Sequence, residues 1–197
     1  MTNIDGEEFK RMRCLAQEVL LDYGICKFPI NVFSLAVKVG MELHPYSKLN
    51  RYKKEKLTQM DGTEKGFTVV KITANGGIVY DTFYNDIDLN EAACRFTIAH
   101  EIKHVVTGDC LKTETEFTET DEILADYFAK CLLAPQAVVL SYGLRYPDAY
   151  VKYFGLSYQA AKNWHSAVEK RKYKFGDEYL FDYEKEFLHG IAIARQN

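Results

Sequence analysis

The feature that most constrains this chain is an apolar run over residues 92–106, long enough for a buried helix. Gly108 follows it in the position where helices commonly end. Asp88, with Glu91 three residues later, can form a capping box at its start. Two histidines and a glutamate interrupt the run within "HEIKH", residues 100–104. Because burying a polar group without a partner costs roughly 1–3 kcal/mol, we expect these side chains to have a specific task.

Two helices and a strand are expected before this run. Apolar residues recur with a helical period from Glu7 to Tyr23, and Gly24 follows in a stop position. Residues 28–40 repeat this signal in a shorter form, and residues 41–47 have the pattern of a strand.

A β-hairpin is predicted from residues 67–72 and 77–81, which flank the turn sequence "TANG". The second of these, "GIVYD", could be an exposed edge that holds an extended peptide by main-chain pairing, or an ordinary core strand. The polar and turn-rich residues 53–66 are expected to form a loop or a hairpin tip. A small mixed or antiparallel sheet follows from these elements.

Helices are also expected after the apolar run. One begins at about Thr120 and is ended by Pro135, and another covers residues 157–171. Ser157 is the expected N-cap of the second. The fold class is therefore α+β, with a small mixed or antiparallel sheet packed against helices that include the one carrying "HEIKH".

The length of 197 residues allows one sizeable core and is too short for two full catalytic domains. We therefore predict a main domain over residues 1–137. Residues 138–197 are predicted to form a C-terminal helical extension packed on the main domain.

The spacing of His100 and His104 is one helical turn, so both rings leave the same face and can converge on one metal ion. Glu101 follows the first histidine, and in the H-E-x-x-H arrangement this position holds a carboxylate near the metal-bound water without ligating the metal. An isolated histidine is more often a hydrogen-bonded core residue. A helix that is otherwise apolar gains no stability from two histidines and a glutamate placed together. The pattern predicts a Zn²⁺ site with His100 and His104 as ligands and Glu101 as the general base.

A third ligand is required, because catalytic zinc sites use three protein ligands and an open position for water. Glu122 is favoured, since Glu122, Ala125, Asp126 and Ala129 share one helix face and the alanines allow a close approach to the histidine helix. Asp126 could then accept the second N–H of a ligating histidine. The alternatives for the third ligand are Asp109, Cys110, Glu114, Glu116 and His165.

Composition gives no reason to expect binding to nucleic acid or to a membrane, because the net charge is -3 and the pI is about 6.0. The five cysteines are dispersed and form no C-x-x-C pair, which fits neither a disulfide framework nor a thiolate zinc cluster. No apolar stretch approaches eighteen residues, and the first thirteen residues are charged where a signal peptide is apolar. A cytoplasmic protein is predicted.

These motifs resemble the ImmA/IrrE family of zinc metallopeptidases. The resemblance rests on "RFTIAHEIKH" at residues 95–104, "EILADYFAKCLLAP" at residues 122–135 and the earlier "FPINVFSLAVKVGMEL". It implies that Glu122 is the third ligand and that Asp126 is an acid behind the ligands. Lys103 departs from the family, which usually has glycine there. Residues 173–197 match nothing in this family.

The resemblance further implies the substrate. Characterised members of the family cut repressors with a helix-turn-helix DNA-binding part, so the expected partner is such a repressor, encoded by a mobile element or a stress-response system. Two alternatives stay open. One is a zinc-containing anti-repressor or toxin-antitoxin-type interaction protein that cleaves nothing, against which the intact Glu101 argues. The other is DNA binding through residues 145–174, which carry seven Lys or Arg and two acids, although such a helix is more often a solvated face.

A further donor for the oxyanion is expected in an enzyme of this kind. The sequence does not distinguish among Tyr80, Tyr84, Tyr127 and the other tyrosines.

Overall fold

The computed structural model describes residues 4–49, 65–112, 116 and 118–196. The chain divides into two compact units, Asn31–Ala125 and a second one formed by Met1–Ile30 together with Asp126–Asn197. These units divide the chain differently from the predicted parts, 1–137 and 138–197. The reason is that the first helix, α1 (Gly6–Asp22), contacts the last helix, α9 (Asp182–Ala194), and therefore groups with the C-terminal residues.

The sheet has three described strands, β1 (Met41–Pro45), β2 (Gly66–Ile72) and β3 (Ile78–Tyr84), in the order β1-β3-β2. The predicted hairpin is confirmed, because β2 pairs antiparallel with β3. β1 pairs parallel with β3, so the sheet is mixed. The residues of "GIVYD" that enter β3 therefore occupy the central strand, and the suggestion that they form an exposed edge was wrong. Most of the residues expected to form the loop or hairpin tip, 53–64, lie outside the described part of the chain.

Helix α4 (Glu91–Thr107) is the predicted apolar helix, and it ends at Gly108, whose φ of 74° is left-handed. The predicted capping box was wrong. Asn90 is the N-cap and its side chain accepts from the amide of Ala93, while the Asp88 carboxylate accepts a hydrogen bond from the side chain of Asn85. The helix thus begins two residues later than that box required.

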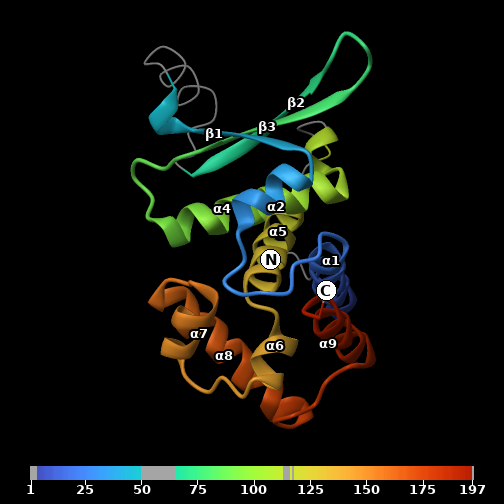
Figure 1. Ribbon diagram of the computed structural model, residues 1–197, viewed down its shortest axis with the longest axis vertical. Helices are drawn as coiled ribbons and strands as arrows, with labels where there is room; N and C mark the ends of the chain where they lie inside the picture. Colours follow the sequence, from blue (N-terminus) through green and yellow to red (C-terminus); the bar gives the residue numbers. More distant parts are fainter. Residues whose placement is uncertain (1–3, 50–64, 113–115, 117, 197) are drawn as a thin grey trace. The chain divides into compact units, whose positions relative to one another are not determined.

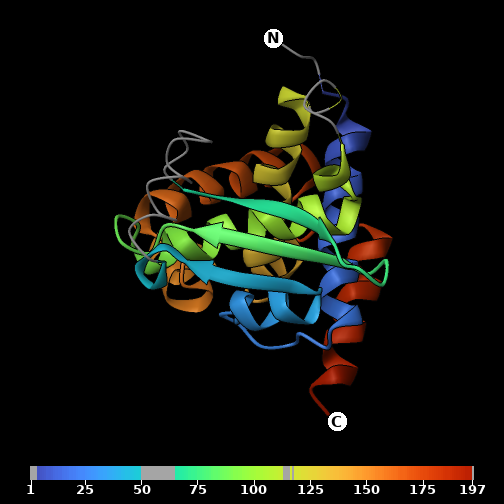
Figure 2. The same ribbon diagram turned by 90° about the horizontal axis from the view of Figure 1, so that it is seen from above.

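The sheet and two helices form the core of the Asn31–Ala125 unit. Helix α4 runs beneath one side of the sheet, as the two views of Figures 1 and 2 show, and contacts both β2 and β3. Helix α2 (Val32–Lys38) contacts β1 and α4. Ile98, Ala99 and Ile102 of α4 are fully buried. This packing fixes the helix that carries the histidines against the sheet.

The remaining elements of this unit are short. The 3-10 turn η1 (Tyr46–Lys48) follows β1, and the turn η2 (Asp109–Leu111) follows α4. Helix α5 (Glu119–Leu133) begins in this unit and continues into the other.

The other unit is helical. Its elements are α1, the later part of α5, α6 (Gln136–Ser141), α7 (Pro147–Phe154), α8 (Tyr158–Phe175) and α9. Pro135 follows the end of α5, and Ser157 caps α8 by accepting from the amide of Ala160, both as predicted. Helices and a small mixed sheet together confirm the α+β fold class.

In the stretch 173–197, which the sequence left unassigned, residues 173–175 complete α8 and residues 182–194 form α9. A buried ion pair joins these helices, because Arg171 of α8 donates two hydrogen bonds to Glu184 of α9. Arg171, one of the seven basic residues on which the DNA-binding alternative depends, is therefore paired with an acid inside this unit.

Candidate metal centre

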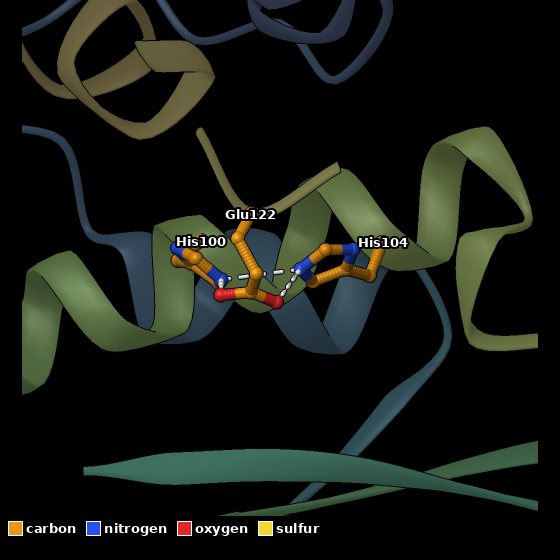
Figure 3. Close-up of side chains that lie close together, drawn as sticks. All are labelled: His100, His104 and Glu122. Atoms are coloured by element: carbon orange, nitrogen blue, oxygen red, sulfur yellow. Dashed lines mark hydrogen bonds and ion pairs between the residues drawn. The ribbon is translucent and has the colours of Figure 1, made fainter. Parts of the chain in front are cut away.

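The two histidines of α4 face one another across one helical turn. His100 and His104 have their Nε2 atoms 3.1 Å apart, and both rings are largely buried, with 15% and 7% of their side-chain surface exposed. Figure 3 shows both rings directed toward the same point. The helical period alone produces this convergence, as the sequence predicted.

Glu122 joins the histidines from the first turns of α5. Its Oε2 lies 3.3 Å from Nε2 of His100 and its Oε1 lies 3.5 Å from Nε2 of His104. In Figure 3 the carboxylate sits between the two rings. The structure therefore brings together the three residues predicted as ligands, with one donor atom of each within 4.8 Å of the others.

The separations among these donor atoms fit a metal ion. Donors at roughly 2.0–2.1 Å from a tetrahedral zinc ion lie about 3.3 Å from one another. The three separations here, 3.1, 3.3 and 3.5 Å, bracket that value. Two imidazole nitrogens and one carboxylate are also a donor set that suits zinc.

The charge state of Glu122 agrees with a role as a ligand. Hydrogen bonds from His100 and His104 hold the pKa of this carboxyl well below its usual range. About half of its side chain is exposed. Glu122 is therefore ionised at neutral pH and directed at two imidazoles, while solvent can reach the group.

Glu101 lies beside this group on α4 and has a different environment. Only 7% of the residue is exposed, and burial raises the pKa of its carboxyl. The charges of His100 and His104 and a hydrogen bond from Thr68 oppose that increase. The hydrogen bond joins Thr68 Oγ1 to Glu101 Oε2 over 2.7 Å. A carboxyl group with a raised pKa next to three candidate ligands is a suitable general base.

Asp109 lies behind His104. Its Oδ2 is 3.5 Å from Nδ1 of His104, the ring nitrogen that does not face Glu122. This distance is an electrostatic contact and not a hydrogen bond. Asp109 was one of the alternatives for the third ligand. In the structure its carboxylate instead lies beside Nδ1 of His104, on the side of the ring away from Glu122.

A buried lysine neutralises Asp109. Lys103 is 1% exposed, its ammonium group donates to the Asp109 carboxylate, and it also donates to the main-chain carbonyl of Asp121 over 3.1 Å. Lys112 reaches Asp109 Oδ1 at 2.7 Å and Asp121 Oδ1 at 2.8 Å. Lys103 therefore links the end of the histidine helix to the residue that precedes Glu122.

Asp126 lies one turn after Glu122 on α5 and is half-buried. It belongs to the helical unit and Glu122 to the other, so its predicted contact with a histidine remains a prediction. His165, one of the alternative ligands, contacts the carbonyl of Arg145 through Nε2 over 2.7 Å. Glu116 is exposed, and Glu114 lies outside the described residues. Of the described residues in the Asn31–Ala125 unit, Cys110 and Glu116 do not join the group formed by His100, His104 and Glu122.

Tyr127, one of the tyrosines considered for the oxyanion, accepts a hydrogen bond of 2.7 Å from Arg13 and packs edge-on against Phe9. These contacts lie within the helical unit and give Tyr127 a packing role. Tyr84 likewise contacts the ring of Phe33.

A second group of possible ligands lies on the sheet. Glu42 and His44 of β1 approach the buried Asp81 of β3, and His44 Nε2 is 2.7 Å from Asp81 Oδ1. The ammonium group of Lys71 already contacts the other oxygen of Asp81. Because the buried carboxylate has a cation and an imidazole as partners, this group is complete as an ion-pair network.

In this α+β fold, α4 presents two histidines to the glutamate of α5, and the three residues form a group that could hold a metal ion. The sequence model of the Peptidase_M78 family, described as the IrrE N-terminal-like domain, matches residues 51–164. Because this match covers more than half of the chain, the chain belongs to that family and has a metallopeptidase-type function. The predicted ImmA/IrrE relationship is confirmed. A search of curated proteins gives no match.

One segment has the length and hydropathy of a membrane-crossing helix among the described residues. It covers Glu119–Ser141, and 72% of its apolar window is buried inside the structure. The core helix of a soluble protein passes the same test, and most of this segment is buried inside the structure.

Proposed function

We propose that this metallopeptidase is a zinc-dependent endopeptidase in which His100, His104 and Glu122 hold the metal and Glu101 is the general base. The observation that carries the proposal is the convergence of the three donor atoms at separations of 3.1–3.5 Å. Zinc, when bound, supplies a Lewis acid that lowers the pKa of water and polarises a carbonyl group.

The chain's own residues perform the proton transfers in this proposal. Glu101 takes a proton from the attacking water as the new C–O bond forms at the scissile carbonyl. It then delivers that proton to the leaving nitrogen as the C–N bond breaks. Burial of Glu101 supports this role, since its raised pKa brings the carboxyl group nearer to the pH at which it must exchange a proton.

The proposed substrate is a DNA-binding repressor of the helix-turn-helix type, with the chain acting in the cytoplasm. The substrate class rests on membership of the family and on the resemblance to peptidases that cut such repressors. The reducing compartment is supported by five cysteines that all carry free thiols.

A glutamine at position 101 tests the mechanism. The Glu101→Gln variant is nearly isosteric, so it should keep its zinc, but removal of the base should slow cleavage by about 10² to 10⁴-fold. Wild type and variant, each with measured zinc, are incubated with the repressor encoded nearest to the gene, and fragments are identified by mass spectrometry.

Fragments from wild type alone support the peptidase. If both proteins bind the repressor equally and neither cuts it with any of several divalent metals, the chain acts by binding, as a non-catalytic anti-repressor would. Equal cutting by both proteins shows that Glu101 is not the base.

A further inference from the structure

Two threonines of the hairpin form a chain of hydroxyl groups that ends on Glu101. Thr68 of β2 and Thr82 of β3 have their Oγ1 atoms 2.9 Å apart, and Thr68 Oγ1 lies 2.7 Å from Oε2 of Glu101. Thr82 is completely buried and Thr68 is half-buried. In Figure 3, β2 is the teal strand that runs across below the three candidate ligands.

The chemistry of the groups fixes the direction of these hydrogen bonds. Thr68 Oγ1 donates to Oε2 of Glu101, and a hydroxyl group has a single proton to donate. Because Thr68 donates its only hydroxyl proton to Glu101, Thr82 must be the donor in the hydrogen bond between the two threonines. Thr82 thus donates to Thr68, and Thr68 donates to Glu101. The hydrogen bond from Thr82 therefore fixes the rotation of the Thr68 hydroxyl group.

The backbone holds this chain in place. Thr68 and Thr82 are direct partners in the antiparallel register of β2 and β3, which puts their side chains on the same face of the sheet. Two residues before Thr68, Gly66 allows β2 to approach α4, because a Cβ atom there would lie 2.7 Å from Cγ2 of Thr97. The position of Thr68 is thus determined by the sheet and not by a mobile loop.

We propose that Thr68 is a positioning residue for the peptidase reaction, which holds Glu101 by one carboxylate oxygen, Oε2, and leaves Oε1 to exchange the proton. Thr82 supports it from behind. This inference rests on the proposed function, because it needs Glu101 as the base. It gives the hairpin a role that the candidate metal ligands do not have, because Thr68 donates a hydrogen bond to the Glu101 carboxylate.

The competing explanation is purely structural, with the threonines only satisfying a buried carboxylate. The two explanations differ in what each variant changes. A structural role predicts that loss of the hydroxyl lowers stability and affects catalysis and substrate binding alike. A positioning role predicts a loss in kcat at unchanged KM, because Glu101 acts in the transition state and not in binding.

The test uses the zinc-loaded full chain with Thr68→Val, which is nearly isosteric and lacks the hydroxyl, and Thr68→Ser, which retains it. We expect Thr68→Val to lower kcat on the repressor by about 10- to 100-fold, as for other groups that orient a metal-site residue. KM and zinc content should stay at the wild-type values. Thr68→Ser should keep most of the wild-type kcat.

A second readout needs no substrate. The protein is labelled with ¹³C at the glutamate δ-carbons, and the Glu101 resonance is identified by its absence from Glu101→Gln. This resonance should move in Thr68→Val and stay near its wild-type position in Thr68→Ser. If Thr68→Val does not fold, Thr82→Val replaces it, with the same direction expected and a smaller effect.

An unmoved Glu101 resonance in Thr68→Val overturns the positioning role, as does a kcat loss in Thr68→Ser equal to that in Thr68→Val. If wild type cuts no repressor, the proposed function fails. The resonance still decides in that case whether Thr68 holds Glu101.

Discussion

At the scale of single residues, the buried carboxylate of Asp109 stays charged because two lysines contact it. Burial alone would raise the pKa of its carboxyl, but hydrogen bonds from Lys103 and Lys112 lower it far below the usual range. The buried ammonium group of Lys103 donates both to the Asp109 carboxylate and to the main-chain carbonyl of Asp121. The charges of Lys103 and Asp109 are therefore held inside the protein by a specific ion pair.

This ion pair predicts an acid-dependent loss of stability. Because the pKa of Asp109 is lowered in the folded chain, its contribution is fully present above the unfolded value of about 3.9. It declines as the pH falls through the lower folded value. Asp109→Asn cannot titrate, so it should be less stable than wild type at pH 7, and the difference should narrow below about pH 4.

The measurement is urea unfolding of metal-free wild type and variant at several pH values between about 7 and 3. Removing the metal separates this effect from the pH dependence of metal binding. Asp177→Asn, at an exposed position, is the matched control and should show no such narrowing. A constant difference between wild type and Asp109→Asn over the whole range would refute the assignment.

The convergence of the candidate ligands was easier to predict from the sequence than the contacts that support them, because the two depend on interactions of different range in sequence. His100 and His104 are four residues apart, so helical geometry alone predicts that they converge. The contact of Thr68 with Glu101 joins residues 33 positions apart in sequence. A hairpin centred on "TANG" could have suggested the pairing of Thr68 with Thr82, but nothing local indicates which helix covers that face of the sheet.

At the scale of the elements, Gly66 controls how closely β2 lies to its neighbours. A Cβ atom at this position would lie 2.6 Å from the carbonyl oxygen of Phe83 and 2.7 Å from Cγ2 of Thr97. The first of these atoms is backbone of the neighbouring strand and cannot turn away. Gly66→Ala should therefore force the strand to shift.

We expect Gly66→Ala to lower the free energy of unfolding by roughly 1–3 kcal/mol, the usual cost of overpacking a core. Gly6→Ala is the control, because a Cβ atom there meets nothing within 4 Å. Both variants are compared with wild type by urea unfolding. If Gly66→Ala is as stable as Gly6→Ala, β2 does not approach α4 as closely as described.

Elements with local signals were predictable, and their arrangement was not. Helical periods, Gly108 and Pro135 marked helix ends correctly because stop signals act over a few residues. The start of α4 was missed because two local candidates compete, and Asn90 caps the helix while Asp88 pairs with Asn85. The sequence left the place of β3 open between an edge and a core strand, because its central position depends on a parallel pairing with β1, from a distant part of the sequence.

At the scale of the whole molecule, the candidate metal centre is formed by residues of two helices. His100 and His104 come from α4 and Glu122 comes from α5, with the turn η2 between them in sequence. A metal ion that binds this folded arrangement and not the unfolded chain stabilises the fold by mass action. The assignment of His100, His104 and Glu122 as ligands can therefore be tested without any substrate, through the binding of the metal itself.

The most direct measurement is the zinc content of purified wild type, Glu122→Ala and Glu119→Ala by elemental analysis after exhaustive dialysis. Glu119 is an exposed acid in the first turn of the same helix and is the matched control. We expect one zinc ion per chain in wild type and in Glu119→Ala, and loss of most zinc in Glu122→Ala. Full zinc occupancy in Glu122→Ala would contradict the assignment of the metal centre.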